Sequence, residues 1–252
     1  MRNNKTLKKE IGWILKEKYK GRLTKTIKKD IERLKSGEPV DYLIDYVEFL
    51  GCKIDLSFQP LIPRVETEYW VKKALGDLKK SKKKKISCLD IFAGSGCIGV
   101  AILHHQEKAT VDFADLKKKF LKQIKINLKL NKIRPKRYRI IQSDVFCKIK
   151  DKYDYIFANP PYIAPQRLKK VQKSVLKFEP RSSIFGGKDG LFFIKKFLKE
   201  AKEHLKKKGK IYLEFDSFQK PKIKEILKKF HYENYSIQKD QYGKWRYLIY
   251  EN

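Results

Sequence analysis

The chain is poor in cysteine and arginine and has no long apolar segment. Its four cysteines include no Cys-x-x-Cys pair, and its four histidines do not cluster with them, which argues against a zinc site and favours reduced, structural thiols. No span approaches about 18 uninterrupted apolar residues, and the N-terminus lacks an apolar signal core. We therefore expect a soluble, cytoplasmic protein with no metal and no membrane contact.

The composition is strongly basic, but arginine contributes little to it. The net charge is +32, and 51 of the 61 basic residues are lysines. Such a charge attracts polyanions such as nucleic acids and ribosomes without specificity, whereas bidentate recognition of phosphates and bases favours arginine. A genome-wide lysine bias explains the composition equally well. The lysine-rich run at residues 79–85 reads as a solvated linker.

Hydrophobic periodicity divides the 252 residues into three parts. Residues 1–38 carry apolar side chains at helical spacing and predict a short helical region. Residues 39–68 form a junction, in which 39–60 alternate enough to predict a β-hairpin turning at Gly51. Residues 69–252 form the main domain, because strands and helices alternate from residue 86 onward as in a doubly wound, Rossmann-like parallel sheet.

The main domain has a defined order of expected elements. Helices are expected from residue 67, after Gly96, and at 116–130, 189–206 and 219–230, with Gly209 ending the fourth of them. The strands are expected at 86–91, 110–114, 138–142, 153–158, 210–215 and 245–250.

A glycine-containing loop, residues 92–96, joins the first of these strands to a helix. Gly94 and Gly96 let a ligand approach the backbone closely, and the helix N-terminus favours an anionic group such as an amino-acid carboxylate. Asp115 ends the next strand about 20 residues later, where a doubly wound sheet places an acid on a ribose diol. The same residue also suits the N-cap of the helix at 116–130. Asp144 follows another strand and is either a loop residue or part of this site.

The tetrapeptide Asn159-Pro160-Pro161-Tyr162 follows the apolar strand at 153–158. Two prolines remove two donors, so the backbone carbonyls there stay free to accept hydrogen bonds from a ligand. Asn159 adds a side-chain carbonyl, and Tyr162 offers an aromatic wall for a planar amide or base. The cluster suits recognition of an NH2 group, although a strand-ending turn is the plainer interpretation.

This tetrapeptide resembles the active-site motif of methyltransferases that use S-adenosylmethionine to methylate amide or exocyclic amine nitrogens. Further segments, in order, resemble the protein-(glutamine-N5) methyltransferases that modify peptide-chain release factors. They are LIPRVETE (61–68), where the family usually has IPRPETE, followed by LDIFAGSGCIG, SDVF, YDYIFANPPYI, FEPRSSIFGGKDGLFF, GKIYLEFDSFQ and QYGKWRYLI. Their collinearity over roughly residues 39–250 is more specific than any one motif.

The resemblance implies a class I methyltransferase fold, S-adenosylmethionine as cofactor, and transfer of its methyl group to the glutamine of a release factor's Gly-Gly-Gln loop. It implies a catalytic role for Asn159, Pro160 and Tyr162. The implied cofactor residues are Phe92, Ala93, Gly94, Ser95, Gly96, Asp115, Asp144, Val145 and Asn159. The implied substrate residues are Asn159, Pro160, Pro161, Tyr162, Arg64 and Glu66.

The chain departs from the family pattern at several positions. Phe92 replaces the first glycine of the loop, Val145 stands where the family often has tryptophan, and Val65 replaces a proline. The helical region before Pro39, which in the family helps to grip the release factor, is shorter than usual.

Two other functions remain open from the sequence. An N6-adenine methyltransferase acting on DNA or RNA would present the same NH2 group to the same acceptors, and the basic charge favours it. The third possibility is a non-catalytic RNA- or ribosome-binding protein on the same scaffold, in which Glu66 and Glu68 are plain helix-start charges.

Overall fold

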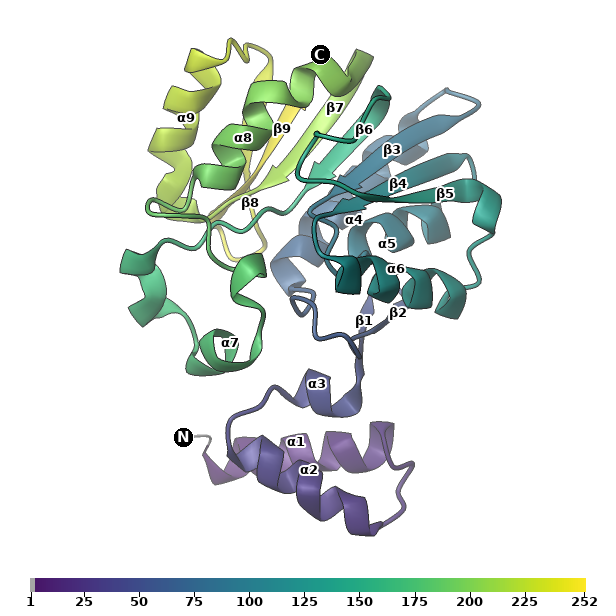
Figure 1. The fold of residues 1–252 in the computed structure, drawn as a ribbon, viewed down its shortest axis with the longest axis vertical. Helices are drawn as coiled ribbons and strands as arrows, with labels where there is room; N and C mark the ends of the chain where they lie inside the picture. The colour runs from purple at the N-terminus through teal and green to yellow at the C-terminus, as the bar shows by residue number, and fades with distance from the viewer. Residues whose placement is uncertain (1–2) are drawn as a thin grey trace.

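The computed structural model describes residues 3–252 and contains an N-terminal helical cluster, a β-hairpin and a larger α/β part (Figure 1). At the N-terminus, α1 (Asn4–Glu17), α2 (Lys25–Lys35) and the short α3 (Val40–Ile44) share a small core. Its buried residues are Ile14, Leu34, Val40 and Leu43. Within the helical region expected at residues 1–38, the structure has α1 and α2, and α3 is an element that the periodicity did not predict.

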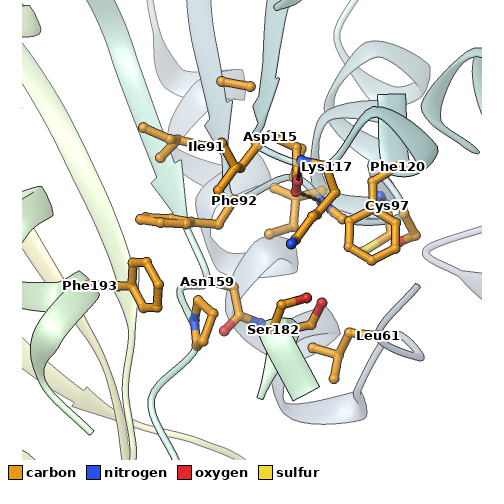
Figure 2. Close-up of a pocket in the computed structure, with 18 of the residues that line it drawn as sticks. Leu61, Ile91, Phe92, Cys97, Asp115, Lys117, Phe120, Asn159, Ser182 and Phe193 are labelled. Carbon is orange, nitrogen blue, oxygen red and sulfur yellow. Dashed lines mark hydrogen bonds between the residues drawn. The ribbon is translucent and has the colours of Figure 1, made fainter. Parts of the chain in front are cut away.

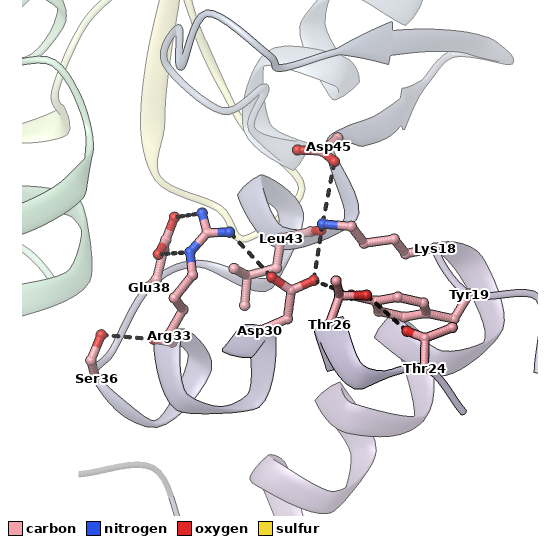
Figure 3. Close-up of polar contacts among 10 residues, drawn as sticks. All are labelled: Lys18, Tyr19, Thr24, Thr26, Asp30, Arg33, Ser36, Glu38, Leu43 and Asp45. Carbon is pink, nitrogen blue, oxygen red and sulfur yellow. Dashed lines mark hydrogen bonds and ion pairs between the residues drawn. The ribbon is translucent and has the colours of Figure 1, made fainter. Parts of the chain in front are cut away.

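A buried carboxylate joins the three N-terminal helices (Figure 3). Asp30 of α2 is 5% exposed and lies 2.9 Å from Lys18 Nζ and 3.2 Å from Arg33 Nη1. Lys18 also donates to the Leu43 carbonyl of α3 at 2.7 Å, and Arg33 donates to Glu38 at 2.9 and 2.6 Å. Because removing one partner of such a cluster leaves a buried charge uncompensated, these pairs fix how the helices sit together.

The junction contains a short hairpin of β1 (Tyr46–Phe49) and β2 (Cys52–Asp55). Leu50 and Gly51 connect the strands with φ angles of 49° and 76°, the left-handed values that a two-residue hairpin turn requires. The turn predicted at Gly51 is confirmed. The hairpin is shorter than the predicted span of 39–60, because the residues before it form α3.

A seven-stranded sheet forms the centre of the α/β part, in the order β5-β4-β3-β6-β7-β9-β8. Its strands are β3 (Ile86–Ile91), β4 (Ala109–Asp115), β5 (Tyr138–Gln142), β6 (Tyr153–Ala158), β7 (Leu205–Glu214), β8 (Tyr235–Lys239) and β9 (Trp245–Glu251). Strands β3 to β7 are parallel, whereas β9 is antiparallel to both of its neighbours. The doubly wound, Rossmann-like sheet is confirmed, with β8 as an edge strand that was not predicted.

The direction in which strands are added reverses between β3 and β6. From β3 the chain proceeds to β4 and β5 on one side, and then returns so that β6 lies on the other side of β3. Ile91 of β3 lies level with Ala114 of β4 and Ala158 of β6, so the segments after these strands emerge together. Ligands of doubly wound sheets bind at such a reversal, outside the carboxyl ends of the strands.

Helices cover both faces of the sheet (Figure 1). One face carries α4 (Val65–Lys80), α5 (Cys97–His105) and α6 (Lys118–Leu130), and the other carries α8 (Phe192–Glu200) and α9 (Lys220–Lys229). Because successive side chains of a strand point to opposite faces, Cys88 and Leu89 of β3 enter different cores. Both faces are therefore apolar, as the continuous hydrophobic runs of the parallel strands indicate.

The helix predicted at 189–206 is wrong in its extent. The observed helix is α8, followed by a 3-10 turn (Ala201–His204), and Gly209 lies inside β7 and ends no helix. Leu205 fits the apolar stripe of the helix but is the buried first residue of β7. Helical periodicity and strand burial both place this leucine in the core, so its spacing does not distinguish them.

Two further segments differ from expectation. The segment between β6 and α8 contains a short helix, α7 (Lys173–Phe178), that was not predicted. In the lysine run, α4 extends to Lys80, and Lys83 Nζ donates to the buried Asp154 at 2.5 Å. All residues of the run 79–85 except the half-buried Ser81 are exposed, as a solvated linker requires, although its first two residues belong to α4.

Candidate active site

The loop after β3 crosses the carboxyl end of the sheet and enters α5. Phe92, Gly94 and Gly96 have φ angles of 60°, 54° and 77°, so left-handed residues alternate along it. A Cβ added at Gly94 would meet only the Phe92 carbonyl at 3.9 Å, which leaves open space beside the backbone. The space belongs to a cavity of about 520 Å³, and this open backbone is what a loop that cradles a ligand requires.

Asp115 at the end of β4 holds this loop in place. Its Oδ2 accepts a hydrogen bond from Gly94 N–H and its Oδ1 accepts one from Lys117 N–H, both at 2.9 Å. Burial raises the pKa of the carboxyl group, and these hydrogen bonds oppose the shift. The N-cap of α6 is Lys117, so the alternative that Asp115 caps a helix starting at residue 116 is wrong. The carboxylate keeps lone pairs that are free to accept from a ligand.

The cavity brings together residues from distant parts of the chain, among them Phe92, Asp115, Asn159 and Phe193 (Figure 2). All predicted cofactor residues line it except Gly96, which packs towards Ile124 behind the loop. The predicted residues on its wall are Phe92, Ala93, Gly94, Ser95, Asp115, Asp144, Val145 and Asn159. The walls are mostly apolar, with oxygen acceptors at a few positions, which is typical of a site for a small organic ligand.

The two residues after β5 that are implied to bind the cofactor, Asp144 and Val145, have different surroundings. The side chain of Asp144 pairs with Lys196 Nζ at 2.7 Å. Val145 is buried and has a φ of 52°, and its carbonyl accepts from Ser143 Oγ at 2.8 Å. The structure therefore places a short aliphatic side chain and a strained backbone at the edge of the cavity, where the family often has an indole ring.

A second cavity of about 340 Å³ adjoins the first at Asn159, which lines both. Of the residues implied to bind the substrate, Pro160, Tyr162, Arg64 and Glu66 line the second cavity, whereas Pro161 lines the first. No donor among residues 3–252 reaches the Pro160 carbonyl.

Hydrogen bonds behind Asn159 and Tyr162 fix these two side chains. Asn159 Nδ2 donates to Thr67 Oγ1 at 3.2 Å, and the Tyr162 hydroxyl donates to Glu214 Oε1 at 3.0 Å. The Tyr162 carbonyl accepts from Gln219 Nε2 at 3.0 Å. A side chain at residue 190 would come within 2.3 Å of that carbonyl, which is why glycine stands there. The tetrapeptide is thus held from several sides.

Arg64 reaches both cavities and is itself anchored. Its Nη2 lies 2.5 Å from Glu179 Oε1, and Glu179 Oε2 accepts from Ile62 N–H at 3.2 Å. Burial raises the pKa of Glu179, and the Arg64 guanidinium opposes the shift. The pair ties the junction to the segment after α7 and closes one side of the second cavity.

Three residues that position the site were not predicted from the sequence: Thr67, Glu179 and Glu214. Glu214 is 1% exposed and ends β7, where a lone glutamate after an apolar strand is the signal that could have found it. Thr67 lies in the segment 61–68, but nothing in that segment shows which of its polar residues turns inward.

The described residues hold no group of three or more His, Cys, Asp or Glu side chains placed to bind a metal ion. Cys52, Cys88 and Cys97 are buried and Cys147 is exposed, all as free thiols. Within residues 3–252, no helix combines the length and the apolar character that crossing a bilayer requires.

The fold, the cavities and the comparison with known families identify the protein as a methyltransferase. Residues 74–178 match the family model described as Methyltransferase small domain. The crystal structure of the ribosomal protein L11 methylase from Lactobacillus delbrueckii subsp. bulgaricus has the same fold, with a TM-score of 0.53 at 17% identity, covering 77% of this chain and 81% of that one.

Closer relatives narrow the class to one family. The release factor glutamine methyltransferase of Lactococcus lactis subsp. lactis (strain IL1403) is 34% identical over 242 residues, covering 95% of this chain and 87% of that protein. The release factor glutamine methyltransferase of Borreliella burgdorferi is 36% identical over 209 residues, covering 81% and 71%. The chain belongs to the release factor glutamine methyltransferase family, which confirms the resemblance seen in its motifs.

Proposed function

We propose that this protein transfers the methyl group of S-adenosylmethionine to the side-chain amide nitrogen of the glutamine in a release factor's Gly-Gly-Gln motif. The observation that carries the proposal is that two cavities meet beside Asn159. Asn159 lines the larger cavity beside the glycine loop and the smaller one beside Pro160 and Tyr162. A methyl donor in the first and an amide in the second face each other across Asn159.

The residues of the larger cavity fit S-adenosylmethionine. The open backbone at Gly94 and the N-terminus of α5 suit its amino-acid carboxylate, and the free lone pairs of Asp115 suit a ribose diol. Phe92 and Phe193 add apolar wall to this cavity. When bound, this compound supplies an electrophilic methyl group on a sulfonium centre.

Asn159 and the Pro160 carbonyl are the proposed acceptors for the substrate amide. An amide nitrogen is a poor nucleophile because its lone pair is delocalised. Two acceptors that take both N–H groups orient the nitrogen and raise its electron density as positive charge develops on it. No strong base is required, because the nitrogen becomes far more acidic once it carries the methyl group. Tyr162 borders the amide as a wall whose hydroxyl is fixed by Glu214.

We assign substrate docking to the parts that precede the main domain, residues 1–38 and 39–68. Arg64 and Glu66 reach the second cavity from the junction, and the helical cluster of α1 to α3 lies beyond it (Figure 1). A release factor is a translation component, so the site of action is the cytoplasm. The net charge of +32 adds weak, salt-dependent attraction to the ribosome.

Transfer of labelled methyl groups tests the proposal. Purified release factors, adenine-containing DNA and RNA are incubated side by side with the protein and labelled S-adenosylmethionine. We expect label in a release factor, and none after its Gly-Gly-Gln glutamine is replaced. Label in nucleic acid alone would favour an adenine methyltransferase, and failure to bind S-adenosylmethionine in calorimetry would favour a non-catalytic protein.

A further inference from the structure

A chain of buried hydrogen bonds runs behind Asn159. Its Nδ2 donates to Thr67 Oγ1 at 3.2 Å, and Thr67 Oγ1 donates to Glu214 Oε2 at 2.7 Å. Glu214 Oε2 also accepts from Trp70 Nε1 at 2.7 Å, and Glu214 Oε1 accepts from the Tyr162 hydroxyl at 3.0 Å. Thr67 is 2% exposed and Glu214 is 1% exposed, so water does not compete for these bonds.

When Glu214 is ionised, only one assignment of donors and acceptors satisfies all of these hydrogen bonds. A carboxylate accepts but does not donate, and the indole N–H of Trp70 donates but does not accept. The single proton of the Thr67 hydroxyl therefore points to Glu214, and its oxygen is left to accept. The group that donates to it from Asn159 must be the NH2 group, since hydrogen-bond partners decide how an amide is turned.

The consequence appears at the cavities. With Nδ2 held at the back, Oδ1 of Asn159 faces forward, and no group among residues 3–252 donates to it. We propose that Thr67, oriented by Glu214, is a positioning residue that presents Asn159 Oδ1 as the acceptor for the substrate amide. This inference rests on the proposed function. On this inference, Thr67 of α4 and Glu214 of β7 determine which way the Asn159 amide is turned. Both elements lie outside the glycine loop and the tetrapeptide.

Two substitutions separate the hydroxyl of Thr67 from its shape. Thr67→Val keeps the volume and removes the hydroxyl, so Asn159 loses its anchor, whereas Thr67→Ser keeps the hydroxyl. We expect Thr67→Val to lower kcat for release-factor methylation about 10- to 100-fold, because a misplaced acceptor loses orientation, with the affinity for S-adenosylhomocysteine unchanged. Thr67→Ser should recover most of the rate. Thr110→Val, on the exposed side of β4, is the matched control and should keep the wild-type rate.

A loss of rate in Thr67→Ser equal to that in Thr67→Val would overturn the proposal, and so would a wild-type kcat in Thr67→Val. A parallel fall in cofactor affinity and thermal stability would indicate a merely structural role and would also overturn it. In Asn159→Ala, which has no amide to orient, adding Thr67→Val should lower the rate no further.

A spectroscopic readout keeps this inference separate from the proposed function. The side-chain NH2 signals of Asn159 are those that Asn159→Ala removes from a 1H–15N spectrum. We expect these signals to shift and to exchange faster with solvent in Thr67→Val, and to return in Thr67→Ser. Unchanged signals in Thr67→Val refute the hydrogen-bond chain. If wild type methylates no release factor while the signals behave as expected, the proposed function fails and the orientation of Asn159 stands.

Discussion

Replacing Phe92 by glycine changes two energies of opposite sign. The φ of 60° at Phe92 lies in the left-handed region, which costs a non-glycine residue roughly 1 kcal/mol that glycine does not pay. Against this, the ring packs on Phe193 and Phe197 with centroid distances of 5.9 and 6.4 Å. Removing a fully buried phenylalanine costs about 3–5 kcal/mol, and Phe92 is only half-buried. We therefore expect Phe92→Gly to lower the free energy of unfolding by about 1–3 kcal/mol.

The comparison with Phe92→Ala isolates the backbone contribution. Alanine removes the same ring but keeps the left-handed strain, so Phe92→Ala should be less stable than Phe92→Gly by about 1 kcal/mol. This order is the reverse of that in a helix interior, where alanine is the more stable of the two. Urea denaturation of both variants measures the difference. Calorimetry with S-adenosylhomocysteine should show only a modest change in affinity, because the backbone at Gly94 and the carboxylate of Asp115 remain.

Either of two results would refute this reasoning. If Phe92→Ala is the more stable variant, the backbone at residue 92 is not left-handed. If both variants lose more than about 5 kcal/mol, the ring is a full core residue, and residue 92 does not correspond to the first glycine of the family's loop.

Three further predictions concern the carboxylates and the amide around the site. Asp115→Ala should weaken S-adenosylhomocysteine binding at least about tenfold in calorimetry and leave the protein folded, since only a few hydrogen bonds are lost; unchanged affinity would contradict this. Asn159→Ala should lower methyl transfer about 100-fold with cofactor binding intact, and Asn159→Asp should also be impaired, because its carboxylate cannot donate to Thr67; full activity of Asn159→Asp on a release factor would show that the reaction does not need the Asn159 amide donor. Burial raises the pKa of Asp90 to about 8, so the folded state holds a proton that the unfolded state releases, and stability is lost as pH rises from about 4 through 8. Because Asp90→Asn cannot release a proton, its free energy of unfolding should rise relative to that of wild type by on the order of 2–4 kcal/mol between pH 4 and pH 8, as measured by urea denaturation. If the two free energies change in parallel with pH, Asp90 does not titrate in this range.

Much of the fold and of the cavity wall could be predicted from the sequence because the signals are local. The apolar runs at 86–91 and 153–158 are each followed by residues that end a strand. A continuous apolar run of this kind is typical of a parallel strand that is buried on both faces. Once the strand at 110–114 is placed beside them and parallel to them, Asp115 and Asn159 must emerge at the same edge of the sheet. The fold class and the meeting of the glycine loop with Asp115 and Asn159 follow from that placement, whereas the family and the other cavity residues were expected from the resemblance of the ordered motifs.

What escaped prediction depends on contacts between distant segments. The hydrogen bond from Thr67 to Glu214 joins residues 147 positions apart, so no local spacing announces it. Strand β8 has no fully buried residue and mixes half-buried and exposed residues at the sheet edge, and such a pattern is shared by many loops. The extents of α8 and β7 were mistaken because Leu205 suits either element.

The position of β9 has a consequence for how the protein is made. This strand follows β8 in the chain but lies between β7 and β8, with Tyr247 opposite Glu214. During translation, residues 235–239 leave the ribosome first and have no strand to pair with until residues 245–251 have emerged. Until then the edge of β7 is an unpaired row of backbone donors and acceptors, open to the strands of other nascent chains. Strand β8 can therefore join the sheet only after β9 has paired with β7, and the edge of β7 is covered by the last strand of the chain.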